Sequence, residues 1–201
     1  FTGEIKKVTI DGVVSTFAKL PAPGEGFTLG MEFSSAGDLY VAMASFDPAT
    51  HGVWKISPDG TDAELFAVLD PTKLPNVVTF DSDGDLFVSD TIGGSIWKID
   101  QNGNAVTWKE DPLLLGILPI VSPLGIPLGA NGLDFDADGD NLYVAVTEHG
   151  RIVRIPVNAD GSAGTVEVFV EDLEKIGLPD GMIFHDSGNL YVAVVGNDRV
   201  V

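Results

Sequence analysis

Four segments of the chain repeat one order of apolar and polar positions. Each copy opens with Phe, continues through a turn of Asp, Ser and Gly residues, and closes on a run of Leu, an aromatic residue, Val and a small residue. The copies are residues 33–42 (FSSAGDLYVA), 80–89 (FDSDGDLFVS), 135–145 (FDADGDNLYVA) and 184–193 (FHDSGNLYVA). An apolar stretch, a glycine-containing turn and a strand-forming run in this order predict a β-hairpin.

The spacing of the copies indicates how these hairpins are assembled. The Leu of each copy recurs after 47, 56 and 48 residues. These positions are Leu39, Leu86, Leu142 and Leu190. Two further strand patterns follow a hairpin, for example residues 96–99 and 105–108, and an Asn-Gly turn joins them. Repeats of this length with four strands each are typical of β-propeller blades. The sequence therefore predicts an all-β fold, a β-propeller of four-stranded antiparallel blades.

Both ends of the chain fall inside blades. Residues 5–17 match a third strand, a turn and a fourth strand, and residues 199–201 match the start of another third strand. We therefore expect 17 strands in a single β-propeller domain over residues 1–201, with incomplete first and last blades. The chain would be most of a six-bladed ring with about one and a half blades outside it. A four-bladed ring closed by pairing of the two ends is the alternative.

One segment breaks the period. Residues 111–129 (DPLLLGILPIVSPLGIPLG) lengthen the interval to 56 residues, and Pro and Gly at every few positions exclude a long helix. A loop this apolar must cover apolar surface. It packs over the rim of the propeller, closes a pocket as a lid, contacts a partner or dips into lipid.

Composition limits the partners. The net charge is −19, from 30 acidic and 11 basic side chains, so a nucleic-acid backbone would be repelled and a divalent cation attracted. No apolar run approaches the roughly 18 residues of a membrane span. The absence of cysteine excludes disulfides and thiolate chemistry. The acidic balance fits a secreted protein, and we expect an extracellular or periplasmic location.

A column of residues precedes the Phe of each copy by four positions. Its members are Leu29, Asn76, Asn131 and Asp180. Because the first strand of a propeller blade is innermost, a residue just before that strand would lie at one mouth of the central channel. Two amide oxygens and a carboxylate that converge there are hard ligands of the kind calcium prefers. The alternative is ordinary turn chemistry, since Asn-Gly and Asp-Gly are favoured turn dipeptides.

Two short segments that contain members of this column resemble a known family. Residues 130–133 (ANGL) and 179–182 (PDGM) resemble the senescence-marker-protein/gluconolactonase family of six-bladed propellers, related to paraoxonases, squid-type phosphotriesterases and strictosidine-synthase-like proteins. The resemblance implies a calcium held by Glu, Asn, Asn and Asp at the channel mouth. The last three match Asn76, Asn131 and Asp180, Leu29 falls where the family usually supplies no ligand, and the Glu would come from outside this chain.

The chain also departs from the family's pattern. Sugar-lactone members carry an Arg two residues before the first Asn, and here that place is Leu74. Together with the apolar insertion, this favours a fairly apolar ester or lactone as the substrate.

Other polar residues fall near the same mouth. The loops between second and third strands contain His51, Asp90, Glu148, His149 and Asn197. His149 beside Glu148 is a candidate general base, although an exposed loop histidine is the commoner case. His185 follows a first strand, so we expect it at the opposite face. The acidic runs 81–85 and 136–140 look like the start of a calcium-binding EF-hand loop, but their repetition marks them as hairpin turns.

These features predict a calcium-dependent hydrolase of lactones or esters. Asn76 and Asn131 would hold the metal, and Asp180 would both ligate it and help to activate a water nucleophile. One alternative is a non-catalytic propeller that binds a ligand or a protein. The other is a strictosidine-synthase-like protein, which would keep the fold without needing calcium.

Overall fold

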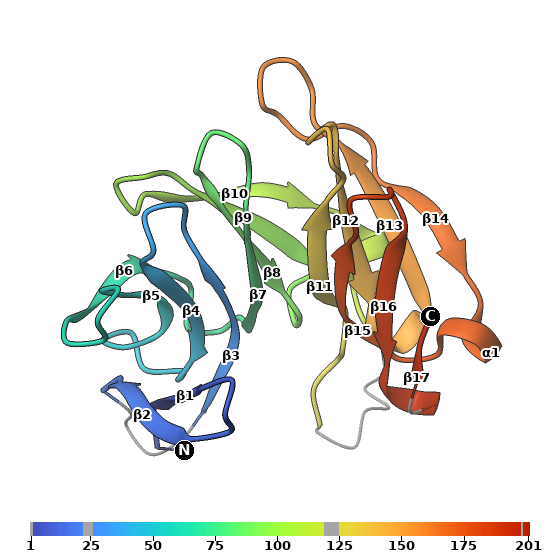
Figure 1. Ribbon diagram of the computed structural model, residues 1–201. Helices are drawn as coiled ribbons and strands as arrows, with labels where there is room; N and C mark the ends of the chain where they lie inside the picture. Colours follow the sequence, from blue (N-terminus) through green and yellow to red (C-terminus); the bar gives the residue numbers. More distant parts are fainter. Residues whose placement is uncertain (1, 22–25, 119–124, 198) are drawn as a thin grey trace.

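The chain forms β-sheets that fan out like the blades of a propeller. The computed structural model describes residues 2–21, 26–118, 125–197 and 199–201 (Figure 1). Within these residues there are 17 strands, and all pairings between them are antiparallel. The predicted all-β fold and the predicted number of strands are confirmed.

Three sheets have four strands and two are shorter. The N-terminal hairpin consists of β1 (Glu4–Val8) and β2 (Val14–Lys19). Blade 1 consists of β3 (Phe27–Phe33), β4 (Leu39–Ala44), β5 (Gly52–Ile56) and β6 (Ala63–Val68). Blade 2 consists of β7 (Pro75–Phe80), β8 (Leu86–Asp90), β9 (Ser95–Ile99) and β10 (Ala105–Glu110). Blade 3 consists of β11 (Ala130–Phe135), β12 (Asn141–Val146), β13 (Arg151–Pro156) and β14 (Glu167–Glu171). Blade 4 consists of β15 (Pro179–Phe184), β16 (Leu190–Val194) and β17 (Arg199–Val200).

Short helical segments connect some of these strands. They are the 3₁₀ helices η1 (Pro112–Leu114), η2 (Thr147–His149) and η3 (Val195–Asn197) and the single-turn helix α1 (Leu173–Ile176). No helix in the described part of the chain has both the length and the apolar character needed to cross a bilayer.

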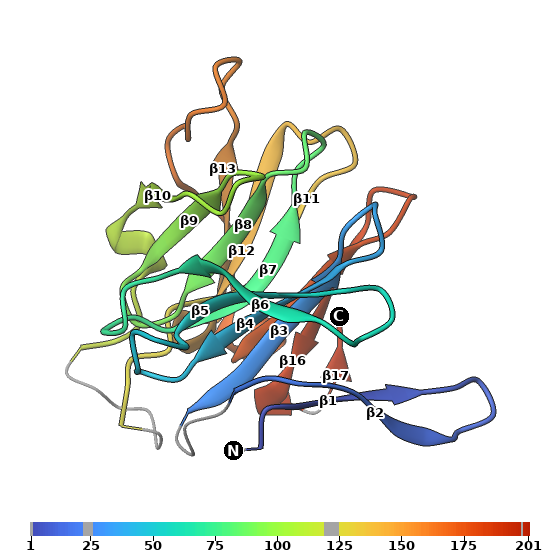
Figure 2. The same cartoon turned by 90° about the vertical axis from the view of Figure 1, so that its left-hand side faces the viewer.

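The first strands of neighbouring blades contact one another and form the inner edge of the propeller (Figures 1 and 2). β3 contacts β7, β7 contacts β11, and β11 contacts β15. In the described residues, β17 pairs only with β16, while β1 and β2 form a sheet of their own. The described strands therefore do not form the alternative ring that is closed by pairing the two ends of the chain.

An aromatic contact that recurs between blades explains the repeated sequence. The Phe that opens the second, third and fourth copies contacts the aromatic ring of the preceding blade's second strand. Tyr40 meets Phe80 at 5.2 Å between ring centroids, and Phe87 meets Phe135 at 5.0 Å, both edge to face. Tyr143 meets Phe184 in the same way at 5.0 Å. Aromatic pairs favour this geometry beyond the area that they bury, so the repeat encodes the seams between blades.

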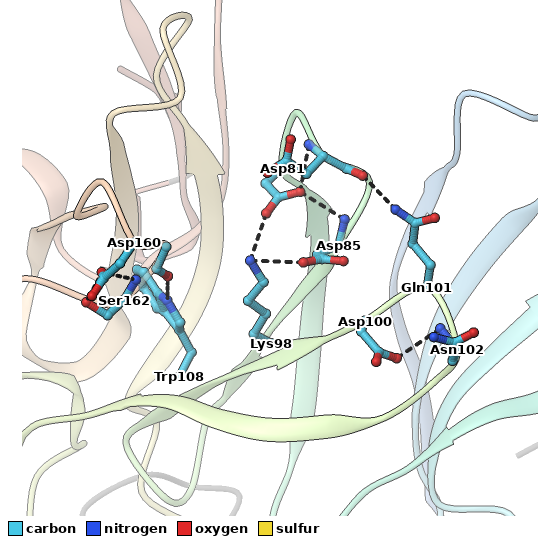
Figure 3. Close-up of polar contacts among 11 residues, drawn as sticks. Asp81, Asp85, Lys98, Asp100, Gln101, Asn102, Trp108, Asp160 and Ser162 are labelled. Atoms are coloured by element: carbon cyan, nitrogen blue, oxygen red, sulfur yellow. Dashed lines mark hydrogen bonds and ion pairs between the residues drawn. The ribbon is translucent and has the colours of Figure 1, made fainter.

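The acidic run 81–85 forms a hairpin turn, as predicted. Asp81 accepts hydrogen bonds from the backbone N–H groups of Asp83 at 3.0 Å and Asp85 at 2.9 Å. Lys98 lies between the two outer carboxylates, 3.2 Å from Asp81 and 3.0 Å from Asp85 (Figure 3). The carboxylates are thus used to close the turn and to pair with a lysine of the same blade.

Glycine allows the inner strands of blades 3 and 4 to approach closely. A Cβ added to Gly132 would lie 2.0 Å from the backbone oxygen of Asp180, whereas one added to Gly181, at the same place in the next blade, would meet nothing within 4 Å. We expect Gly132→Ala to lower the free energy of unfolding by about 1–3 kcal/mol through overpacking. Gly181→Ala is the matched control and should change it by less than about 0.5 kcal/mol. Urea unfolding of both variants checks this, and equal effects would contradict the account.

Candidate functional site

The column of residues lies inside the first strands, not before them. Asn76, Asn131 and Asp180 are each the second residue of β7, β11 and β15. The strand pairing is interrupted there in each blade, between Pro75 and Val78 in blade 2 and at the equivalent places of blades 3 and 4. The prediction that these residues lie just ahead of the strand is therefore wrong: they lie inside it, at a β-bulge. A bulge re-aims a side chain, so these residues leave the strand's alternation.

Asn76 and Asn131 are brought into contact although they are 55 residues apart. The Asn76 amide nitrogen donates a hydrogen bond of 2.9 Å to the Asn131 side-chain oxygen. Asn76 is half-buried, and Asn131 is 9% exposed. The two amides therefore meet at the inner seam between blades 2 and 3.

A threonine hydroxyl orients each of these amides. Thr91 Oγ1 donates to the backbone oxygen of Ala130 at 2.8 Å, and Thr147 Oγ1 donates to that of Pro179 at 2.9 Å. Each hydroxyl has one proton, so it must accept from its asparagine. Asn76 donates to Thr91 at 3.0 Å and Asn131 donates to Thr147 at 3.1 Å. This fixes the amide nitrogens toward the threonines and their oxygens away from them.

Asp180 lies in the next blade along the same inner edge. It is half-buried, and within the described residues its carboxylate has no hydrogen bond or ion pair. Its contact with blade 3 is made by the backbone, at Gly132. The residue of blade 4 that corresponds to Thr147 is Val195, which carries no hydroxyl. Among the described residues, no group donates a hydrogen bond to this carboxylate.

These three side chains have the donor set that suits a hard cation. They supply two amide oxygens and one carboxylate, which are calcium ligands by type. An amide oxygen has two lone pairs, so Asn131 can accept from Asn76 and still ligate a cation. In the part of the chain that the structure describes, no cluster of three or more His, Asp and Glu side chains could hold a metal. The residues present fit calcium through oxygen donors, most of them neutral.

Leu29 occupies the equivalent place of blade 1. It lies partly buried against the apolar cluster between blades 1 and 2, where Tyr40, Val78 and Val88 pack. An apolar side chain at this place adds no oxygen ligand.

Two acidic residues lie three positions further along the first strands, and sequence reasoning missed them. They are Glu32 in β3 and Asp134 in β11. Burial raises the pKa of both carboxyls, and the charge of Asp134 raises that of Glu32 further. Asp134 Oδ2 accepts from the Phe184 backbone N–H at 2.7 Å, which ties β11 to β15. Their fixed position in the sequence, three residues after a member of the column, was the signal that could have identified them.

Glu148 and His149 do not act as a pair. Glu148 is 8% exposed, and its Oε2 accepts from the backbone N–H groups of Ile117 at 2.7 Å and Leu128 at 3.1 Å. His149 is half-buried in η2, and no hydrogen bond joins it to Glu148 within the described residues. Partial burial and then the charge of Arg151 lower the pKa of His149. The imidazole is therefore neutral near pH 7.

His51 and Asp90 are parts of the framework. His51 is fully buried, its Nδ1 accepts from the Phe46 N–H at 3.1 Å, and burial lowers its pKa. Asp90 is also fully buried and accepts from the N–H groups of Leu74 and Gly93 and from the Ser95 hydroxyl. Neither side chain is accessible to a substrate.

The remaining polar candidates, Asn197 and His185, lie in connections of blade 4. Asn197 ends η3, after the second strand of blade 4. His185 lies in the turn between β15 and β16, where its Nδ1 accepts from the Ser187 N–H at 3.1 Å. That turn is at the opposite end of β15 from Asp180, so His185 is at the opposite face, as predicted.

The described parts of the apolar insertion pack on the rim of the propeller. Leu114 is fully buried in the cluster between blades 2 and 3. Gly129 donates a backbone hydrogen bond of 3.0 Å to the oxygen of Thr91. The insertion therefore reaches the same end of the strands as Asn76 and Asn131 (Figure 1). The predicted lid would include residues 119–124, which lie outside the described residues.

Comparison with known proteins agrees with this architecture. Residues 121–201 match the family described as the SMP-30/gluconolactonase/LRE-like region. Pentonolactonase XacC of Haloferax volcanii is 30% identical over 141 residues, which cover 67% of this chain and 43% of that protein. Lactonase drp35 of Staphylococcus epidermidis is 25% identical over 171 residues, which cover 82% of this chain and 49% of that protein. The chain thus spans about half the length of the curated relatives it matches.

A solved structure extends the likeness of fold over nearly the whole chain. Virginiamycin B lyase of Staphylococcus aureus superposes with a TM-score of 0.70 at 18% identity, over 99% of this chain and 59% of the lyase. At that identity the likeness concerns the fold alone. The family match, the lactonase relatives and the propeller fold all make the chain similar to the SMP-30/gluconolactonase-like family.

Proposed function

We propose that the protein is a calcium-dependent hydrolase of lactones or esters, with its active site at the mouth where Asn76, Asn131 and Asp180 lie. The observation that carries this proposal is the pair of asparagine amides held by Thr91 and Thr147 with their oxygens turned away from the hydroxyls. Amides needed only for turn formation would not require such orientation. The lactonase relatives support the reaction class.

Each residue has a part in this proposal. Asn76 and Asn131 would contribute amide oxygens, and Asp180 would contribute the negative charge. A bound calcium would supply a Lewis acid for the substrate carbonyl. Asp180, whose carboxylate has no donor within the described residues, would orient a water molecule and take its proton. The water oxygen then bonds to the carbonyl carbon, the ring C–O bond breaks, and the leaving oxygen becomes the hydroxyl of a hydroxy acid.

His149 is the second candidate for proton transfer. It lies in η2, two residues after Thr147, which orients Asn131. Its lowered pKa keeps the ring neutral near pH 7, as a general base requires.

The substrate in this proposal is a fairly apolar lactone or ester. Leu74 is apolar and 5% exposed, so this position offers no charge to a sugar hydroxyl. The insertion adds apolar side chains at the same end of the propeller, among them Leu118, which is 67% exposed.

Calcium removal tests the proposal. We expect the purified protein to bind about one calcium per chain and to hydrolyse alkyl lactones or esters. A chelator should abolish turnover, and added calcium should restore it. Elemental analysis and a pH-stat assay with a panel of lactones and esters measure both. Turnover that survives chelation would remove calcium from the mechanism. Bound calcium without turnover on any member of the panel would favour a ligand-binding propeller.

A further inference from the structure

Glu148 is a buried carboxylate that the proposed chemistry does not use. It is 8% exposed, and no ion pair to it occurs within the described residues. A buried charge is costly unless strong hydrogen bonds compensate for it. The donors that compensate this one therefore indicate what the residue does.

Those donors come from both arms of the apolar insertion. Glu148 Oε2 accepts from the Ile117 N–H at 2.7 Å on the first arm and from the Leu128 N–H at 3.1 Å on the second. Glu148 also donates its own backbone N–H to the Leu128 oxygen at 3.0 Å. Hydrogen bonds to a charged acceptor are stronger than neutral ones, so a single oxygen ties two segments together.

The two arms cross where neither has a side chain. A Cβ on Gly116 would lie 2.6 Å from Leu128 N and 2.7 Å from Glu148 Oε2. A Cβ on Gly129 would lie 2.4 Å from Leu114 O and 2.7 Å from Gly116 N. We call this crossing, residues 115–117 and 128–129 with Glu148, the neck. The backbones of the two arms are therefore in direct contact at the neck.

The neck is directly joined to the threonines that orient the candidate metal ligands. Gly129 donates its N–H to Thr91 O at 3.0 Å, and Thr147 donates its N–H to Gly129 O at 3.1 Å. Thr91 and Thr147 are the residues whose hydroxyls hold Asn76 and Asn131. The apolar side chains next to the neck therefore lie beside the proposed active site.

We propose that Glu148 is a positioning residue that sets the neck, so that the apolar side chains beside it, Ile117, Leu118 and Leu128, form one wall of the substrate site and select lactones or esters with a long alkyl chain. This selectivity rests on the proposed function, because it assumes that substrate binds at the same mouth. Glu148 acts through the two arms and does not touch the reacting atoms. Its remaining oxygen, Oε1, is buried without a hydrogen-bond partner among the described residues, so the charge is used at one point, the neck.

The test uses Glu148→Ala and the conservative Glu148→Gln, with Glu171→Gln as the matched control. Glu171 is exposed and forms an ion pair of 2.9 Å with the buried Arg151 at the same end of blade 3. Hydrogen exchange reports on the neck without any activity. We expect the protection of the Ile117 and Leu128 amides to fall about 10-fold or more in Glu148→Ala and less in Glu148→Gln, which keeps an acceptor oxygen. Glu171→Gln should leave both amides protected, and unchanged protection in Glu148→Ala would overturn the proposal.

Binding of two unreactive lactams, one with a long alkyl chain and one without, tests selectivity apart from catalysis. In Glu148→Ala we expect long-chain lactam affinity to fall about 10-fold and short-chain affinity to stay within about twofold. Equal losses for both probes, or no binding of the long-chain lactam to the unmodified protein, would overturn the proposal. If selective lactam binding persists while no lactone is hydrolysed, the proposed function fails and the role of Glu148 stands.

Discussion

Replacing Asp180 with Asn should weaken calcium binding by at least about 100-fold and reduce lactone turnover by about 1000-fold or more. Asp180 is the only charged member of the candidate ligand set, and Asn keeps its size and one oxygen. The variant therefore removes charge and basicity with little change in packing. Calorimetric titration with calcium and a pH-stat assay at saturating calcium measure the two effects separately.

A second aspartate of the same blade provides the control. Asp186 is exposed in the turn after β15, at the opposite end of that strand from Asp180. Asp186→Asn makes the same change in net charge, so it corrects for the general attraction that a chain of charge −19 exerts on cations. We expect it to bind calcium and turn over substrate like the unmodified protein. If the two variants behave alike, Asp180 is not a ligand and the column is turn chemistry.

The blade architecture was predictable because its signals are local. Each copy of the repeat contains a Phe, an Asp/Gly turn and an aromatic strand, from which the hairpin and the seams to neighbouring blades are built. The turn at residues 81–85 needs only its own carboxylates and Lys98 of the same sheet. The intervals between copies then give the blades, and partial copies at the two ends give the incomplete sheets.

The geometry of the site was less predictable because it depends on contacts between blades. A fixed offset from Phe80 and Phe135 identified Asn76 and Asn131, but not the bulges that contain them. The hydrogen bond between their side chains joins residues 55 positions apart, so the sequence around either residue does not predict it. Glu148 shows the same limit, because its proximity to His149 in sequence suggested a catalytic pair, whereas its carboxylate binds the arms of the insertion.

Removing the Thr147 hydroxyl should weaken the site without touching any ligand. Thr147→Val keeps the shape but removes both the acceptor for Asn131 and the donor to the Pro179 oxygen. Residues that orient metal ligands contribute about 10- to 100-fold in affinity, so we expect a loss of calcium affinity in that range. The two buried partners left unsatisfied should also lower the free energy of unfolding by about 1–3 kcal/mol.

Comparison with Thr147→Ser separates orientation from packing, because serine keeps the hydroxyl and loses only a methyl group. We expect Thr147→Ser to bind calcium within about threefold of the unmodified protein, even though the missing methyl group lowers its stability by about 1 kcal/mol. Thr107→Val, on the exposed strand β10, makes the same substitution far from the column and should change neither quantity. A Thr147→Val variant with lowered stability and unchanged calcium affinity would mean that the hydroxyl holds blades 3 and 4 together without orienting Asn131. The threonine would then be part of the seam between blades, and the case for a metal site would rest on Asp180 alone.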